Sequence, residues 1–310
     1  MTDKKFSTEY KKYIESAELP VDYQAEILSN LKKNTEEPQK YKFYNNRKLV
    51  ASLVAAVLVV CVGLSVCFSL NFFKTQDVTL NFKVVSATNL KGIYGAKIVF
   101  ISPSGERIKD ENGEDITVFT DENGTATVTL PTDEDYTVEV TADGFITLEE
   151  SAEDGNYYIS PIMNDDTYRA VLTWDKECDL DAHLSVTAHD NTEKINYYKS
   201  DIKDENGDVL ASLDVDNETG DGPETITFNT DKNSLWRFSV CSYSALKENS
   251  KLSLFEAKPK VTLYQGNKLV DTYTLDIETA DNVWCVFEIE NGEIKLSDYT
   301  HSVNAVTEIE

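Results

Sequence analysis

The chain has 310 residues, with 29 Lys or Arg against 55 Asp or Glu, and its formal net charge is −26. This length allows one or two globular domains beside other segments. The negative charge repels nucleic acid and anionic lipid headgroups, which excludes both as partners of the acidic part of the chain. The same charge suits divalent cations or basic ligands, although solubility at a crowded cell surface would also explain it.

The first 48 residues are expected to form two short helices separated at Leu19-Pro20. In the second, Tyr23, Ile27 and Leu31 recur every four residues and form one apolar stripe. A segment this short cannot bury the stripe by itself, so the stripe would meet a cytoplasmic partner or the membrane surface. The alternative is a loosely structured tail that only helps to set the membrane topology.

An uncharged apolar run occupies residues 49–73. Its 25 residues would form a helix about 37 Å long, enough to cross a hydrocarbon core of about 30 Å. A buried core helix would show a polar stripe, and a secretory signal would lie near the start of the chain. Here 48 residues of mainly polar character come first. The sequence therefore predicts one transmembrane helix.

The flanking charges predict the orientation of this helix. Four basic residues stand just before it: Lys40, Lys42, Arg47 and Lys48. Only Lys74 follows closely, so the positive-inside rule places residues 1–48 in the cytoplasm and the rest outside the plasma membrane. Residues 1–48 hold ten Lys/Arg and eight Asp/Glu, which leaves 19 basic and 47 acidic residues beyond the run.

Beyond residue 74 the apolar residues recur with a period of two. Residues 78–84, 125–130 and 136–140 alternate in this way, which predicts β-strands. Turn dipeptides lie between such runs: Asn112-Gly113, Asn123-Gly124, Asp143-Gly144, Asn206-Gly207 and Asn291-Gly292. No long amphipathic helix is predicted in this part. The expected fold is an all-β ectodomain of two tandem β-sandwiches, anchored by one N-terminal transmembrane α-helix.

The tetrapeptide Asp-Glu-Asn-Gly occurs at residues 110–113, 121–124 and 204–207. None of the three continues with the ligand spacing and closing glutamate of an EF-hand, so we expect hairpin turns.

Three cysteines lie beyond the apolar run, namely Cys178, Cys241 and Cys285. An odd number gives no complete disulfide framework. One Cys241–Cys285 bridge and three buried free thiols are both compatible with the sequence.

The first strand-rich block covers residues 76–163 and ends at a boundary near residues 161–167. It contains the turn and strand segments Gly95-Ala96-Lys97-Ile98, Thr120-Asp121-Glu122-Asn123-Gly124, Tyr136-Thr137-Val138 and Asp143-Gly144-Phe145. Through these segments the block resembles the carboxypeptidase-regulatory-like (prealbumin-like) modules of bacterial surface proteins. It implies a β-sandwich and no particular site.

Acidic residues gather in the second block. The segment from Cys178 to Leu184 alternates strictly, so Asp179, Asp181 and His183 would share one face of a strand. Further acidic residues follow in a second strand and a glycine turn: Asp214 and Asp216, which would project together, and then Asp221 and Glu224.

Hard oxygen ligands from two strands and a turn are what a calcium ion needs. The predicted metal ligands are Asp179, Asp181, Asp214, Asp216, Asp221 and Glu224. His183 would support a ligand rather than bind, because calcium prefers oxygen. In the alternative the acids are structural: Asp179 and Asp181 cap a strand end on a solvated face, and residues 221–224 form a bare turn.

The second block covers residues 168–300, and residues 301–310 would be a tail. In order, the block holds the segments Val171-Leu172-Thr173-Trp174, Asp179-Leu180-Asp181-x-His183, Leu213-Asp214-Val215-Asp216, Gly222-Pro223-Glu224-Thr225-Ile226 and Trp284-x-Val286-Phe287-Glu288-Ile289. Through these segments it resembles the YfaP-like domains of bacterial extracytoplasmic proteins. The Asp-Leu-Asp strand and the acidic glycine turn are also similar to those of calcium-binding tellurite-resistance domains. That similarity implies a bound metal.

These features favour a membrane-anchored binding or scaffolding protein of the cell surface, whose ligand would be a protein or a polysaccharide. An alternative is a single-pass signalling protein whose residues 1–48 dock a cytoplasmic regulator. A metal-dependent hydrolase is less favoured, because the chain has only three histidines and no nucleophile elbow, zincin helix or phosphate loop. We therefore expect no enzymatic activity.

Overall fold

The computed structural model describes residues 25–27 and 29, and residues 77–309 except 132–134, 190, 219, 221 and 247–251. Residues 25–27 and 29 are helical, and the rest of the predicted cytoplasmic segment lies outside the described residues. The predicted transmembrane run at 49–73 and the predicted ligand Asp221 lie outside them as well. Within the described part of the chain, no helix has the length and apolar character needed to cross a membrane.

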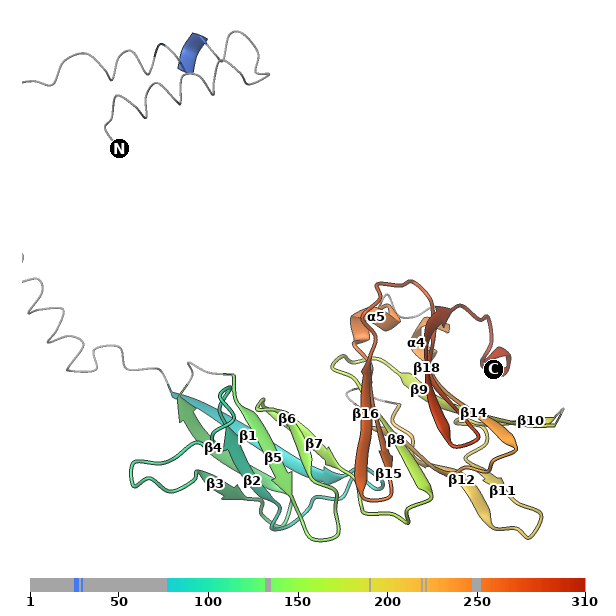
Figure 1. The fold of residues 1–310 in the computed structure, drawn as a ribbon, viewed down its shortest axis with the longest axis horizontal. Helices are drawn as coiled ribbons and strands as arrows, with labels where there is room; N and C mark the ends of the chain where they lie inside the picture. The colour runs from blue at the N-terminus through green and yellow to red at the C-terminus, as the bar shows by residue number, and fades with distance from the viewer. Residues whose placement is uncertain are drawn as a thin grey trace, which may run out of the picture. The chain divides into compact units, whose positions relative to one another are not determined.

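The chain between residues 77 and 159 forms seven strands in two sheets (Figure 1). The strands are β1 (Asp77–Ser86), β2 (Lys97–Ile101), β3 (Thr117–Phe119), β4 (Thr125–Pro131), β5 (Thr137–Thr141), β6 (Leu148–Ser151) and β7 (Gly155–Ile159). One sheet has the order β4-β1-β7 and the other β3-β2-β5-β6. The β1–β7 pair is parallel, and the other pairs of these strands are antiparallel.

The two sheets share one hydrophobic core, as in a β-sandwich, and we call residues 77–159 the first sandwich. In β1 the side chains of Leu80, Phe82 and Val84 enter this core, as the predicted alternation requires. The ring of Phe82 packs 5.7 Å from that of Phe100 on the opposite sheet and 5.3 Å from that of Tyr157 (centroid distances). The predicted strands are therefore confirmed here.

Eleven further strands lie between residues 167 and 301 (Figure 1). They are β8 (Thr167–Thr173), β9 (Leu180–Ala188), β10 (Asn191–Ile195), β11 (Asp201–Lys203), β12 (Val209–Val215), β13 (Glu224–Asn229), β14 (Ser234–Ser242), β15 (Lys260–Gln265), β16 (Lys268–Thr274), β17 (Val283–Glu290) and β18 (Glu293–His301). They form a sheet of order β10-β9-β14-β17-β18 and a sheet of order β11-β12-β13-β8-β15-β16. We call residues 167–301 the second sandwich.

A second core fills the space between these two sheets. Leu180, Ala182 and Leu184 of β9 contribute to it, together with the buried rings of Trp236 and Trp284. The helices beside it are short: α4 (Tyr243–Leu246), α5 (Leu254–Ala257) and the 3-10 helix η1 (Val306–Glu308). The described residues after 74 thus contain no long helix, and the all-β prediction is confirmed.

The three Asp-Glu-Asn-Gly segments are turns, as predicted. In each, the N–H of the glycine donates to the carbonyl of the aspartate three positions earlier, at 3.0 Å. Backbone N–H groups also donate to the carboxylates of Asp110, Asp121 and Asp204, which lowers the pKa of each. The carboxylates organise turns.

The cysteines of the second sandwich are free thiols, so the possible Cys241–Cys285 bridge is not formed. Cys241 and Cys285 are buried in a cluster with Val303, Val306 and Ile309. The chain after β18 was expected to be a tail, but these three apolar residues pack it against the sheet. Burial raises the pKa of the Cys241 thiol.

Candidate metal centre

Asp181 is a buried carboxylate on β9. The strand directs Leu180 and Ala182 into the core, so Asp181 and His183 lie on its other face, as predicted. Only 4% of Asp181 is exposed, and its Oδ2 atom has no hydrogen-bond partner. The alternative that Asp181 caps a strand end on a solvated face is therefore wrong. A buried unpaired carboxylate oxygen is costly, which calls for a compensating positive charge or proton.

Glu224 is the first residue of β13 and is 1% exposed. Its Oε2 atom accepts a hydrogen bond of 2.6 Å from the N–H of Ala182, and Oε1 accepts one of 3.3 Å from the N–H of Asn217. Burial raises the pKa of Glu224 well above its ordinary value, the Ala182 hydrogen bond lowers it, and the charges of Asp181 and Asp216 raise it again. Burial therefore favours the uncharged form of Glu224 relative to an exposed glutamate.

Asp216 follows the end of β12 and is exposed. It begins the turn that returns the chain to β13. Within this turn the side-chain amide of Asn217 donates to the carbonyl of Gly222 at 2.6 Å. Gly222 has φ +65°, and a Cβ there would lie 3.0 Å from the Cα of Thr173, so a side chain at this position would strain the backbone and crowd β8.

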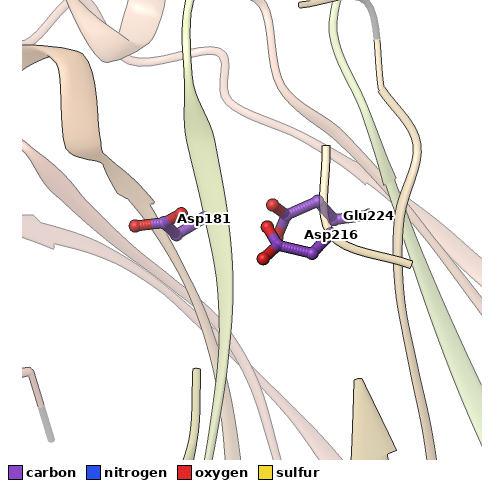
Figure 2. Close-up of side chains that lie close together, drawn as sticks. All are labelled: Asp181, Asp216 and Glu224. Carbon is purple, nitrogen blue, oxygen red and sulfur yellow. The ribbon is translucent and has the colours of Figure 1, made fainter. Parts of the chain in front are cut away.

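These three residues form the acidic triad, defined as Asp181, Asp216 and Glu224 (Figure 2). One carboxylate oxygen from each lies within 4.8 Å of the other two. Calcium binds oxygens at about 2.3–2.6 Å, so two oxygens on one ion can be up to about 5 Å apart. The triad therefore fits a single hard cation, with Asp216 on the solvent side, where water could complete the coordination.

The structure brings together three of the six predicted ligands. Asp214 lies outside the triad and serves another purpose: its Oδ1 accepts a hydrogen bond from the Ser212 hydroxyl at 2.6 Å, and its Oδ2 lies 3.9 Å from Nε of Arg169. The register of β12 on β13 shifts between Leu213 and Val215, which interrupts the alternation that was expected to align Asp214 with Asp216.

Asp179 precedes β9, and its backbone N–H donates to the Ser244 hydroxyl at 2.9 Å. It is not part of the triad. The Nε2 atom of His183 is 3.9 Å from Oδ2 of Asp181, too long for a hydrogen bond, and is itself buried without a partner. His183 thus lies beside a triad carboxylate, as expected for a supporting residue.

Asn217 was missed by the sequence reasoning. Its backbone binds Glu224 and its side chain binds Gly222, so it holds the two ends of the turn together. An asparagine near the start of a turn that contains two glycines is a known turn-forming signal and could have identified it.

No family model and no curated protein matches the sequence. Among solved structures, the chain is similar to a protein of unknown function, SAV2460, with a TM-score of 0.36 and 13% identity over 46% of this chain and 92% of the other. A homologue of telluride resistance protein (TerD) from Streptomyces coelicolor A3(2) gives a TM-score of 0.35 and 14% identity over 45% and 91%. The major pilin subunit BcpA of Bacillus cereus gives 0.22 and 10% over 64% and 69%.

Proposed function

We propose that the second sandwich binds a divalent cation, calcium, at the acidic triad, and that the protein is an extracytoplasmic binding or scaffolding protein. The observation that carries the cation site is the unpaired, buried Oδ2 of Asp181 beside a second buried carboxyl group, that of Glu224. A hard divalent ion would compensate both and would take its remaining ligands from Asp216 and water.

The donor set favours calcium or magnesium over transition metals. The triad offers carboxylate oxygens alone, whereas softer metals prefer imidazole or thiolate ligands. Calcium accepts six to eight oxygens in irregular geometry, which suits a site assembled from a strand, a strand end and a turn. Bound in this way, the ion would stabilise the turn between β12 and β13.

The membrane anchor and the cell-surface location are part of the same proposal. They are supported by the apolar run at 49–73, the basic residues before it and the acidic excess after it. The similarity of the two blocks to carboxypeptidase-regulatory-like and YfaP-like domains supports an extracytoplasmic role. The ligand would be a surface protein or polysaccharide.

Calcium-dependent thermal unfolding of the full chain in detergent tests the cation site. All three tryptophans, Trp174, Trp236 and Trp284, are buried in the second sandwich, so their fluorescence reports its unfolding alone. At calcium about 100-fold above Kd, binding adds about 2.7 kcal/mol. We expect the Tm to rise by about 5 °C or more relative to a chelator.

Two aspartate variants separate the triad from its neighbours. Asp181→Asn should abolish the calcium-induced rise in Tm. Asp214→Asn serves as the matched control and should keep the rise, even if removing the partner of Arg169 lowers the Tm itself. If calcium leaves the wild-type Tm unchanged, or if Asp181→Asn responds like the wild type, the proposed site is wrong.

A further inference from the structure

The turn between β12 and β13, which we call the triad turn because Asp216 begins it and Glu224 follows its end, also contacts the first sandwich. The carbonyl of Gly222, which Asn217 holds from within the turn, accepts a hydrogen bond of 3.0 Å from the phenol of Tyr158 on β7. The same carbonyl therefore joins the triad turn to a strand of the other sandwich. Both sandwiches belong to one compact unit of residues 75–310. Tyr158 also packs against a small apolar cluster between the two sandwiches, and we call this region of contact the junction.

A second hydrogen bond starts at the residue next to Glu224. The hydroxyl of Thr225 donates to the carbonyl of Ala87 at 2.7 Å, and both residues are fully buried. Ala87 follows β1 and its own N–H donates to the carbonyl of Ile159 at the end of β7. A displacement of Glu224 would therefore move Thr225, and through these two hydrogen bonds it would disturb the ends of β1 and β7.

The rest of the junction does not involve the triad. Ala87, Ile146, Val171 and Tyr264 form its apolar cluster. Lys260 of β15 forms an ion pair of 2.5 Å with Glu150 of β6. Arg169 of β8 donates to the Ser160 hydroxyl at 2.7 Å. These contacts hold the sandwiches together with or without a cation. The two hydrogen bonds Tyr158–Gly222 and Thr225–Ala87 add to them, and only these two depend on residues next to the triad.

Without a cation, Asp216 and Glu224 lie close to the buried Asp181, whose Oδ2 has no hydrogen-bond partner, and this crowding of acidic groups favours opening of the turn. A cation would draw Asp216 and Glu224 together and fix both ends of the turn. Gly222 and Thr225, which bond to the first sandwich, lie within two residues of Glu224.

We propose that cation binding at the acidic triad stiffens the junction between the two sandwiches. The effect would pass through the two hydrogen bonds Tyr158–Gly222 and Thr225–Ala87. This inference rests on the proposed function, and it adds a regulatory role: calcium would set how firmly the second sandwich is held on the first. Coupling of this kind is reciprocal, so a firm junction also raises the affinity for the cation.

Hydrogen–deuterium exchange of the full chain in detergent, with calcium or with a chelator, tests the coupling. Peptides covering 180–184 and 214–224 report the site, and peptides covering 84–92 and 155–161 report the junction side of the first sandwich. Peptides from β2 and β3 serve as the remote control. We expect calcium to slow exchange at both the site and the junction by about fivefold or more, the lower end of measured couplings, and to leave β2 and β3 unchanged.

The double variant Tyr158→Phe/Thr225→Val removes both donors and leaves every triad carboxylate in place. Calcium should still protect its site peptides, which also shows that it is folded, but should no longer protect 84–92 and 155–161. Tyr158→Phe alone should lose part of the junction effect.

The outcomes separate the two proposals. Protection of the site without protection of the junction in the wild type overturns the coupling and leaves the proposed function standing. Protection of the junction that persists in the double variant also overturns it. If calcium protects neither region, the cation site fails and the coupling fails with it.

Discussion

At the scale of single residues, Glu224 combines almost complete burial with two acidic neighbours. Its pKa is raised above the ordinary value of 4.5, chiefly by burial. The uncharged group contributes stability that is fully present below pH 4.5 and is lost as the pH rises towards the raised pKa of the folded state. The cation-free second sandwich should therefore become less stable as the pH rises through this window.

The same property predicts that calcium competes with a proton. Below the raised pKa of Glu224, calcium binding must release the proton of this residue. The calcium affinity should therefore increase about tenfold for each unit by which the pH rises, as expected for the exchange of one proton. Isothermal titration calorimetry in two buffers of different ionisation enthalpy measures the proton release, and titrations at pH 5 and pH 8 measure the affinity.

Glu224→Gln is the control for this prediction. Glutamine keeps an oxygen that can accept the Ala182 hydrogen bond but carries no proton to release. This variant should bind calcium weakly and should lose the pH dependence of cation-free stability. Equal calcium affinity at pH 5 and pH 8 in the wild type would contradict the assignment of Glu224 as a ligand.

At the scale of elements, two turns with the same sequence differ in their surroundings. Gly113 and Gly124 both end an Asp-Glu-Asn-Gly turn, with φ +83° and +79°. A Cβ on Gly113 would meet nothing within 4 Å, whereas a Cβ on Gly124 would lie 2.3 Å from the carbonyl oxygen of Val84. Backbone atoms cannot move aside as a flexible side chain can, so β1 itself would have to shift.

Substitution by alanine should therefore have unequal effects. Gly113→Ala should lower the free energy of unfolding of the first sandwich by about 1 kcal/mol, the cost of a positive φ in a residue with a side chain. Gly124→Ala should cost about 1–3 kcal/mol more because of the overlap. Differential scanning calorimetry of the full chain measures both, and equal losses would show that backbone strain alone matters at this turn.

The sequence could predict features that depend on neighbouring residues, but it could not predict contacts between residues far apart in the chain. Alternation is local, so the placement of Leu180, Asp181 and Ala182 on β9 could be predicted from spacing. The ion pair of Asp214 with Arg169 could not be predicted, because Arg169 lies on β8 and comes close to Asp214 only when the sheet forms. The near-complete burial of Glu224 likewise depends on its packing beside β9, which the turn sequence does not reveal.

At the scale of the whole molecule, the junction between the sandwiches was also hidden. The run of residues 163–167 is mainly polar and favours a plain boundary, yet the carbonyl of Pro161 just before it accepts a hydrogen bond of 2.8 Å from Arg169. Arg169 is 7% exposed and bonds both to the boundary segment and to the hydroxyl of Thr227 in the second sandwich. A buried arginine that joins the boundary segment to the second sandwich has no signature in the local sequence pattern.

The net charge of −26 leads to a last prediction. It distinguishes the general effect of salt on the Tm from the effect of calcium bound at the acidic triad. Self-repulsion destabilises a strongly acidic folded chain, and salt screens it over about 10 Å at 0.1 M. Raising NaCl from about 0.01 to 0.15 M should raise the Tm of the wild type and of Asp181→Asn equally, because one buried carboxylate hardly changes the total field. Calcium at about 1 mM, in the range where extracellular modules bind it, should then raise the Tm further in the wild type alone. With the ionic strength held constant, screening does not change, so equal gains in both proteins would mean that calcium binds elsewhere and that the acidic triad is not its binding site.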